Sequence, residues 1–302
     1  MNRHSLRPSP VPNESNLHGR FGVTRSRLRT ARGLLGMLGL AVWLAACSPQ
    51  SPATKDSSLE RVLNAKELAM GFDPSFQPMT FCTDFNEYVG FDIDFAREVC
   101  KRMGVTLQLR PLRWVEKDTE LANGHIDCIW GAFSLTSERM TRLRCSHPYI
   151  RNQQVVVVPA DSTVYSLEDL HGLRVGVQAG AETAWLGIRQ SGLENQLAAI
   201  QEFQDSLDAL LDMETCGIDA AVLDSVHVQD VIRRSGKNYR ILEQALSEEG
   251  YGVAFRRADT ALAQAIQTHM AAMYHDGTLA ALAQQWFGTA QNLIAPAEEP
   301  RP

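Results

Sequence analysis

Arg139 and Asp224 are the residues whose type and position best suit the binding of a charged small molecule. Arg139 lies three residues after Thr136, whose hydroxyl can cap the start of a predicted helix. A guanidinium in the first turn of a helix offers a planar fork for a carboxylate, and the free N–H groups of that turn assist it. Alternatively, Arg139 is a surface residue that pairs with a neighbouring acid. Asp224 ends an apolar strand over 218–223, where open α/β sheets bind ligands, but it could also cap the helix predicted from Val226.

Two kinds of pattern alternate along the chain and predict the elements that hold these side chains. Apolar runs predict strands over 68–72, 105–109, 126–133, 155–158, 174–178, 218–223 and 251–255. Apolar residues at helical spacing predict helices between them. Repeated strand–helix–strand units imply mostly parallel sheets with helices on both faces. We therefore predict an α/β protein, whose ordered part of about 230 residues suits two lobes.

The charge of the chain is distributed unevenly, and this excludes one class of partner. The 302 residues carry a net charge of −6, yet the first 46 residues hold seven Arg and only one Glu. The remainder carries 22 basic and 34 acidic side chains. Because nucleic-acid binding needs clustered Lys and Arg, we expect no nucleic-acid partner.

The N-terminus has the pattern of a bacterial lipoprotein signal. Arg residues precede a short apolar run over 34–46, which is too short to span a bilayer and ends in Leu44-Ala45-Ala46-Cys47. We predict a signal peptide over 1–46, lipid on Cys47 and a flexible Ser/Pro-rich tether over 47–58. The predicted location is outside the cytoplasm and anchored to a membrane, although which membrane stays open. The alternative is an ordinary signal peptide followed by a buried or disulfide-bonded Cys47.

The other cysteines and the histidines give no sign of a metal site. Five cysteines remain, so at most two disulfides can form, and their connectivity stays open. No Cys-x-x-Cys occurs, and the eight His have no pair at ligand spacing. Cys100 and Cys128 lie in apolar patterns and are predicted to be small buried hydrophobic residues. We predict no metal and no cofactor. The remaining three cysteines are Cys82, Cys145 and Cys216.

A series of motifs in a fixed order resembles a known protein family. They include Gly90-Phe91-Asp92-Ile93-Asp94, Ser146-His147-Pro148-Tyr149 and Tyr251-Gly252-Val253-Ala254-Phe255. The other segments that carry the likeness are 71–78, 124–127, 133–139, 167–177, 219–224, 276–279 and 286–288. Over roughly residues 59–288 the chain resembles the family 3 extracellular solute-binding proteins, which are the polar-amino-acid receptors of ABC importers.

The resemblance implies a two-lobed clamshell of the type II periplasmic binding protein fold. Lobe 1 would comprise residues 59–150 and 248–290, and lobe 2 would comprise residues 151–247. Each lobe would hold a mostly parallel sheet flanked by helices. Two short crossing strands, near 149–154 and 247–251, would form the hinge. A disordered tail would follow over 291–302.

The resemblance also implies which residues bind the ligand in the cleft between the lobes. Arg139 would bind the ligand carboxylate and Asp224 its α-ammonium, so that one zwitterion joins opposite lobes and favours closure. Phe76 and Trp114 would sandwich the ligand side chain, with core packing as the alternative. Asp73 would contact its far end, unless it is only a turn residue before Pro74. The remaining expected contacts are Ser134 and the Ala132 carbonyl with an ionic group, and Gln178 at a position that varies with specificity.

One segment departs from the family pattern. Relatives usually have Ser or Thr where Ala181 and Glu182 stand, and they use the hydroxyl and backbone N–H groups on the carboxylate. Here only the backbone donors remain. Because an inward Glu182 would repel a ligand carboxylate, we expect its side chain to turn outward.

These features predict a non-catalytic, monomeric lipoprotein that captures a polar amino acid for an ABC permease and its ATPase. Asp73 favours an amide or basic ligand side chain, and the lack of a basic residue at a matched side-chain position argues against glutamate or aspartate. One alternative is a lyase resembling cyclohexadienyl dehydratase, with Glu182 as its acid or base. Another is a free-standing amino-acid sensor component.

Overall fold

The computed structural model describes residues 56–291 and 293–295, which belong to one compact unit. The predicted signal peptide, Cys47 and most of the predicted tether therefore lie outside the described residues. The last tether residue, Ser58, begins helix α1 (Ser58–Ala65). Within the described part of the chain, no helix is both long and apolar enough to cross a membrane.

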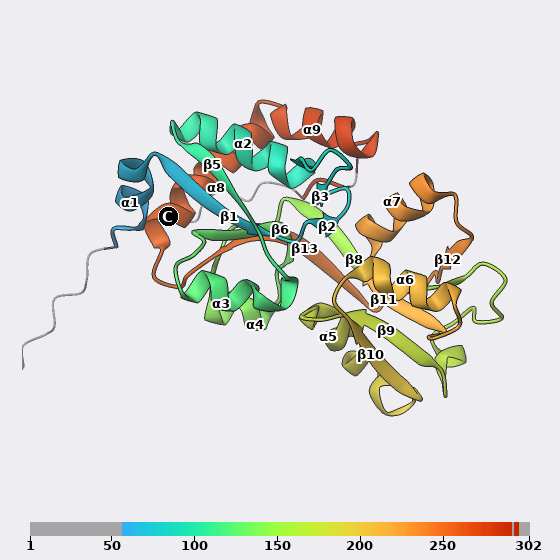
Figure 1. The fold of residues 1–302 in the computed structure, drawn as a ribbon. Coiled ribbons are helices and arrows are strands. Elements are labelled where there is room, and N and C mark those ends of the chain that lie inside the picture. Colours follow the sequence, from blue (N-terminus) through green and yellow to red (C-terminus); the bar gives the residue numbers. More distant parts are fainter. Residues whose placement is uncertain (1–55, 292, 296–302) are drawn as a thin grey trace, which may run out of the picture. The chain divides into compact units, whose positions relative to one another are not determined.

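The central element of the fold is a ten-stranded mixed sheet (Figure 1). Its main order is β10 (Ala199–Phe203), β9 (Arg174–Gln178), β11 (Ala220–Asp224), β8 (Ile150–Pro159), β13 (Ser247–Phe255), β6 (Cys128–Ser134), β1 (Glu67–Phe72) and β5 (Thr106–Pro111). Off this path, β12 (Tyr239–Ile241) pairs with β8 and β7 (Arg144–Cys145) pairs with β13. A separate small sheet holds β2 (Ser75–Phe76), β3 (Thr80–Cys82) and β4 (Tyr88–Val89).

The two antiparallel strands β8 and β13 join the two ends of the sheet. At the first end, β1 is parallel to β5 and β6, and at the second end β9 is parallel to β10 and β11. Residues 150–154 of β8 pair with residues 247–251 of β13, as predicted for the crossing strands. The α/β class and the crossing pair are therefore confirmed, while the lobe boundaries stay a prediction.

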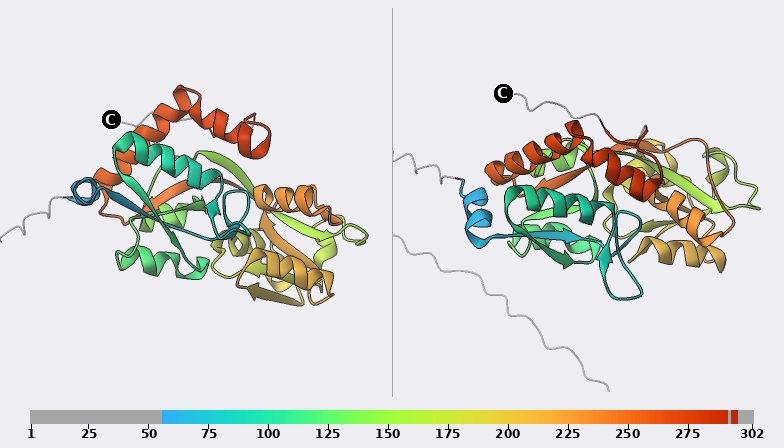
Figure 2. Two further views of the ribbon diagram at one scale, coloured as in Figure 1. Left: turned by 45° about the horizontal axis from the view of Figure 1, so that its top comes forward. Right: turned by 90° about the horizontal axis from the view of Figure 1, so that it is seen from above.

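Helices cover both faces of the sheet at the first end (Figure 2). Helices α1, α2 (Phe91–Met103), α8 (Thr260–His275) and α9 (Thr278–Phe287) pack on one face. The short η1 (Trp114–Glu116) and α3 (Lys117–Ala122) pack on the opposite face, followed in the chain by α4 (Ser137–Arg142). Both faces need helices because strand β6 is apolar on both sides. Cys128 and Trp130 pack in the hydrophobic cluster under α2, α8 and α9, whereas Ile129 and Phe133 pack in the cluster with η1 and α3.

The second end repeats this arrangement with other helices. Helix α5 (Glu182–Gln190) covers one face, and α6 (Ser206–Glu214) and α7 (Ser225–Ser235) cover the other. Two single 3-10 turns, Glu168–Leu170 and Leu193–Asn195, complete the described helices. Val156 and Val158 of β8 face the first of these clusters, and Val155 and Val157 face the second. A continuous β-branched run is thus buried on both faces, as expected for a central strand.

Residues 293–295, which fall within the segment predicted to be a tail, contact the rest of the described fold. Ile294 forms a β-bridge with Ile150, and the Ala295 N–H donates to the Tyr149 carbonyl at 3.0 Å. The side chains of Leu293 and Ile294 pack against the first hydrophobic cluster, while residues 292 and 296–302 lie outside the described residues.

The five described cysteines all have free thiols. Cys100 and Cys128 are buried in the main hydrophobic cluster, which confirms the prediction for these two. Burial raises the pKa of the Cys100 thiol to about 12, so it packs as a neutral hydrophobic group.

Candidate functional site

A cavity lies where the carboxyl ends of strands from both ends of the sheet meet the crossing strands. Its free volume is about 20 Å³, roughly that of one water molecule, so the side chains that line it nearly fill it in this structure. Nine of the ten predicted ligand-binding residues line it. The first end supplies Asp73, Phe76, Trp114, Ala132, Ser134 and Arg139, and the second end supplies Gln178, Ala181 and Asp224. Gly131 and Thr183 also line the cavity, and sequence reasoning missed both.

Arg139 lies in the wall of this cavity and has several contacts within the protein. Its backbone N–H donates to the Thr136 hydroxyl at 3.1 Å, as predicted for a capped helix start. The side chain is 2% exposed, and its Nη1 donates to the Ser134 carbonyl at 2.8 Å. The guanidinium carbon lies 4.3 Å from the ring centroid of Phe133. A buried guanidinium with donors left over can bind an anionic ligand group.

Glu182 is the one predicted ligand-binding residue that does not line the cavity, and its side chain is 40% exposed. Its Oε2 accepts a hydrogen bond from Arg139 Nε at 2.9 Å and lies 3.4 Å from Arg142 Nη2. The buried guanidinium explains this orientation, because a buried charge needs a partner and Glu182 is the acid within reach. Burial alone would raise the pKa of Glu182, but Arg139 and the other nearby cations lower it below its ordinary value.

Lys117 is a second buried cation that the sequence did not reveal. Its Nζ donates to the Gly180 carbonyl at 3.1 Å, and it lies 5.1 Å from the ring centroid of Trp114. Burial and the charge of Arg139 lower the pKa of Lys117 to about 8. A lysine among polar neighbours on a short predicted helix gives no signal of this burial.

Asp224 closes β11 at the opposite side of the cavity. Its Oδ1 accepts hydrogen bonds from the Tyr251 hydroxyl at 2.7 Å and from Asn152 Nδ2. It occupies the N-cap position of α7 but makes no capping hydrogen bond, so the capping alternative does not explain it. Burial and the neighbouring charge of Glu249 raise its pKa above the ordinary range.

Glu249 of β13 stands behind Asp224, and sequence reasoning missed it as well. Its Oε2 accepts hydrogen bonds from Ser134 Oγ at 2.5 Å and from Asn152 Nδ2 and Gln154 Nε2, both at 3.3 Å. Its Oε1 accepts from Ser247 Oγ at 3.2 Å. One carboxylate therefore gathers donors from β6, β8 and β13.

A different set of contacts closes the far side of the cavity. Asp73 Oδ1 accepts from the Ser75 N–H at 2.9 Å, and its Oδ2 accepts from Gln178 Nε2 at 2.6 Å. The ring of Phe76 stacks on His227, with centroids 4.5 Å apart and planes 19° apart. His227 covers one face of Phe76, so only the other face is available to a ligand. Trp114 contacts Phe133 edge to face, with centroids 6.2 Å apart.

Ala132 has an unusual backbone conformation. Its φ of 50° lies in the left-handed region that favours glycine, and its N–H donates to Asp92 Oδ2 at 2.8 Å. Burial raises the pKa of Asp92 to about 7. The hydrogen bond from Ala132 to Asp92 holds this residue of the cavity wall in place.

Thr183 supplies a hydroxyl in the first turn of α5, which begins at Glu182. It is buried, and its Oγ1 accepts from Gln154 Nε2 at 3.2 Å. The hydroxyl that the family pattern places at Ala181 or Glu182 is thus present one or two residues later. The sequence signal that could have identified Thr183 is its position as a hydroxyl residue in the first helical turn after Gly180.

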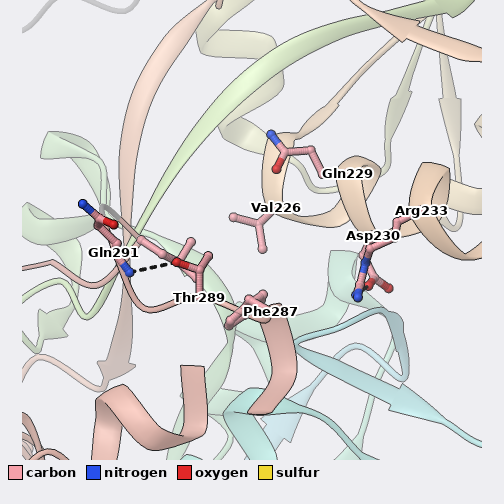
Figure 3. A pocket seen from close by; sticks show the side chains of 8 residues that line it. Val226, Gln229, Asp230, Arg233, Phe287, Thr289 and Gln291 are labelled. Carbon is pink, nitrogen blue, oxygen red and sulfur yellow. Dashed lines mark hydrogen bonds and ion pairs between the residues drawn. The ribbon is translucent and has the colours of Figure 1, made fainter. Parts of the chain in front are cut away.

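A wider groove lies between α7 and the end of α9 (Figure 3). Val226 and Phe287 line it with the polar side chains of Gln229 and Thr289. Its one acid, Asp230, forms ion pairs with Arg233 and Arg234 of its own helix. These charges are paired within α7, so the groove suits a small zwitterion less well than the smaller cavity does. Across residues 56–291 and 293–295, no group of three His, Cys, Asp or Glu is placed to hold a metal ion.

Comparison with known proteins places the chain in a family. The profile of the bacterial extracellular solute-binding proteins, family 3, matches residues 68–289. The L-cystine-binding protein TcyJ of Escherichia coli (strain K12) is 27% identical over 260 residues, which cover 85% of this chain and 95% of that protein.

Two solved structures show the same fold. An ABC uptake transporter substrate-binding protein from Streptococcus pneumoniae with bound histidine has a TM-score of 0.76 and 30% identity, covering 80% of this chain and 99% of that chain. The ancestral amino acid-binding protein AncCDT-1, a precursor of cyclohexadienyl dehydratase, has a TM-score of 0.70 and 26% identity, covering 76% and 100%. The chain therefore belongs to the bacterial extracellular solute-binding proteins, family 3.

Proposed function

We propose that this member of the extracellular solute-binding family captures one polar amino acid in the cavity between Arg139 and Asp224 and delivers it to an ABC permease and its ATPase. The observation that carries the proposal is the placement of a buried guanidinium and a half-buried carboxylate on the walls of one cavity, on elements from opposite ends of the sheet. One zwitterion between them would neutralise both charges and join the two ends.

The ionic groups of the ligand would be held in a defined direction. The carboxylate would bind the free donors of Arg139 and the N–H and hydroxyl of Thr183 at the start of α5. The ammonium would donate to Asp224, to Ser134 Oγ and to the Ala132 carbonyl. Each contact pairs a charge that leaves water, which is the condition for binding an amino acid in a small cavity.

The side chain of the ligand would lie toward Asp73 and Gln178, with Trp114 and the free face of Phe76 beside it. Asp73 and Gln178 offer an acidic and an amide group, which favours an amide or basic side chain. The histidine bound to the Streptococcus pneumoniae relative supports a basic ligand, and the cystine specificity in the name of TcyJ supports testing cystine as well.

Isothermal titration calorimetry on ligand-stripped protein tests this proposal. The panel comprises the common amino acids, ornithine, cystine and small peptides. We expect one ligand per chain, with the tightest binding among Arg, His, Gln and related side chains. A folded, ligand-stripped protein that binds no member of the panel would refute the proposed function.

A lyase activity is the second candidate because AncCDT-1 has the same fold and Glu182 pairs with Arg139 of the cavity wall. The ion pair with Arg139 argues against it, since a carboxyl with a lowered pKa is ionised at neutral pH and is a poor general acid. Incubation with prephenate and arogenate is the test. Formation of an aromatic product would establish the enzyme and displace the binding role.

We also propose that Cys47 carries the lipid that anchors the protein outside the cytoplasm, and that the chain acts as a monomer. The apolar run before Cys47 and the Ser/Pro-rich segment after it support the anchor. Mass spectrometry of protein extracted from membranes should show a diacylated Cys47 at the mature N-terminus. Recovery of an unmodified protein in the soluble fraction would contradict the anchor.

A further inference from the structure

Glu249 is placed to control which hydroxyl in the ligand cavity accepts and which donates. We propose that Glu249 is a positioning residue that makes Ser134 an obligate hydrogen-bond acceptor for the ligand ammonium and leaves Thr183 a donor for the ligand carboxylate. This inference rests on the proposed amino-acid binding and adds a residue that sets selectivity for the amino group. It follows from the hydrogen-bond capacity of each group that contacts Glu249.

Ser134 has a single hydroxyl hydrogen, and Glu249 takes it. The Ser134 Oγ to Glu249 Oε2 distance is 2.5 Å, which marks a strong charge-assisted hydrogen bond. A carboxylate can only accept, so the hydroxyl must donate to it. What remains of Ser134 Oγ is a pair of acceptor sites, and Ser134 lines the cavity beside Asp224. A ligand group that meets this oxygen must therefore be a donor.

The same carboxylate sets the orientation of two amides on β8. Asn152 Nδ2 and Gln154 Nε2 both lie 3.3 Å from Glu249 Oε2, and an amide can face a carboxylate only with its NH₂ group. Asn152 confirms this orientation independently, because its Oδ1 accepts from the Val226 backbone N–H at 3.3 Å, and a backbone N–H can only donate. With Nδ2 so directed, Asn152 also donates to Asp224 Oδ1, which accepts from the Tyr251 hydroxyl as well.

Gln154 connects Glu249 to Thr183, the residue proposed to bind the ligand carboxylate. Gln154 Nε2 also lies 3.2 Å from Thr183 Oγ1, so Thr183 accepts this hydrogen bond. The Thr183 hydroxyl hydrogen is then free to point into the cavity that Thr183 lines. The two hydroxyls thus have opposite polarity: Ser134 accepts near Asp224, and Thr183 donates near the start of α5. This arrangement matches an α-amino acid and disfavours an analogue without the ammonium group.

The experiment compares each amino acid with the 2-hydroxy acid of the same side chain. The probes are L-histidine with imidazolelactic acid, and L-arginine with 2-hydroxy-5-guanidinopentanoic acid, titrated by calorimetry at pH 8 so that Asp224 is ionised. In Glu249→Gln the residue can donate to Ser134, which frees the Ser134 hydroxyl to donate into the cavity. We expect the affinity ratio of amino acid to hydroxy acid to fall by about tenfold, as for loss of one hydrogen bond to a charged group.

A matched control and a double-mutant cycle separate this role from a general charge effect. Glu248→Gln removes an exposed carboxylate from the neighbouring position of β13 and should leave the ratio unchanged. Ser134→Ala should lower the ratio by a similar factor to Glu249→Gln, and adding Glu249→Gln to it should change the ratio by less than about threefold.

The outcomes are distinguishable. An unchanged ratio in Glu249→Gln, or an equal effect of Glu249→Gln with and without the Ser134 hydroxyl, would overturn the inference while the proposed function stands. If Glu249→Gln does not fold, an unchanged ratio in Ser134→Ala overturns it in the same way. A wild-type protein that binds no amino acid would overturn the proposed function itself.

Discussion

The ion pair between Arg139 and Glu182 gives a prediction whose sign is not obvious. Glu182 accepts from Arg139 Nε at 2.9 Å, and a ligand carboxylate would bind the free Nη2 edge of the same guanidinium. Glu182→Gln removes the negative charge but keeps an oxygen that can accept from Nε. The substitution therefore isolates the charge of Glu182 from its hydrogen bond.

The magnitude follows from Coulomb's law and the exposure of the two groups. Two anions bound at different edges of one guanidinium lie about 6 Å apart. The Glu182 side chain is 40% exposed, so an effective dielectric constant of ~40 is appropriate, and the repulsion is about 1.4 kcal/mol. Part of this is offset because the ion pair also ties the two ends of the sheet together. We expect Glu182→Gln to bind its amino acid about three- to tenfold more tightly.

Calorimetry at low and high salt measures this effect. The gain should be largest at about 50 mM salt and should shrink at about 500 mM, where charges near the surface are screened. Glu138→Gln is the matched control, because Glu138 is an exposed acid on α4 that lies 3.8 Å from Arg142. It should leave the affinity unchanged. Binding weakened more than about threefold in Glu182→Gln at low salt would refute the reasoning and show that its charge is needed for closure.

Three further predictions concern titratable groups whose pKa the fold shifts. Because the pKa of Asp224 is raised, the affinity for the amino acid should fall as the pH is lowered from 8 to 5 and the carboxylate is protonated. Asp224→Asn should remove this pH dependence and most of the binding, which calorimetry at several pH values measures. Burial lowers the pKa of His227, so the folded protein should lose stability as the pH falls below about 6.5 and the buried ring has to take up a proton. If the melting temperature of His227→Gln falls with acid as steeply as that of the wild type, this prediction is contradicted. Asp92→Ala leaves the Ala132 N–H without its acceptor and should cost about 1–3 kcal/mol in urea unfolding, whereas an unchanged midpoint would show that this hydrogen bond is unimportant.

Much of the fold could be predicted because strong local patterns carry it. The β-branched run Val155–Val158 has no helical alternative, and in the structure it is buried on both faces of a central strand. Thr136 and Arg139 were placed correctly because a helix cap acts over three residues. The same holds for the gathering of residues such as Asp73 and Asp224 around one cavity, which the resemblance to a family with a known topology made predictable.

What could not be predicted depends on partners that are distant in the chain. Glu182 pairs with Arg139, which lies 43 residues earlier and is buried. Lys117 is buried against the Gly180 carbonyl, a contact that no local pattern encodes. Glu249 acquires its role from donors on β6 and β8, more than 90 residues away. Side-chain orientation in a cavity is set by the sum of such contacts, which the sequence does not display.

The direction of a bound amino acid is the central claim, and a crystal structure of the liganded protein measures it most directly. We expect the ligand carboxylate on Arg139 and the Thr183 hydroxyl, and its ammonium on Asp224 and Ser134 Oγ. A ligand bound in the opposite direction, or one that contacts neither Arg139 nor Asp224, would contradict it.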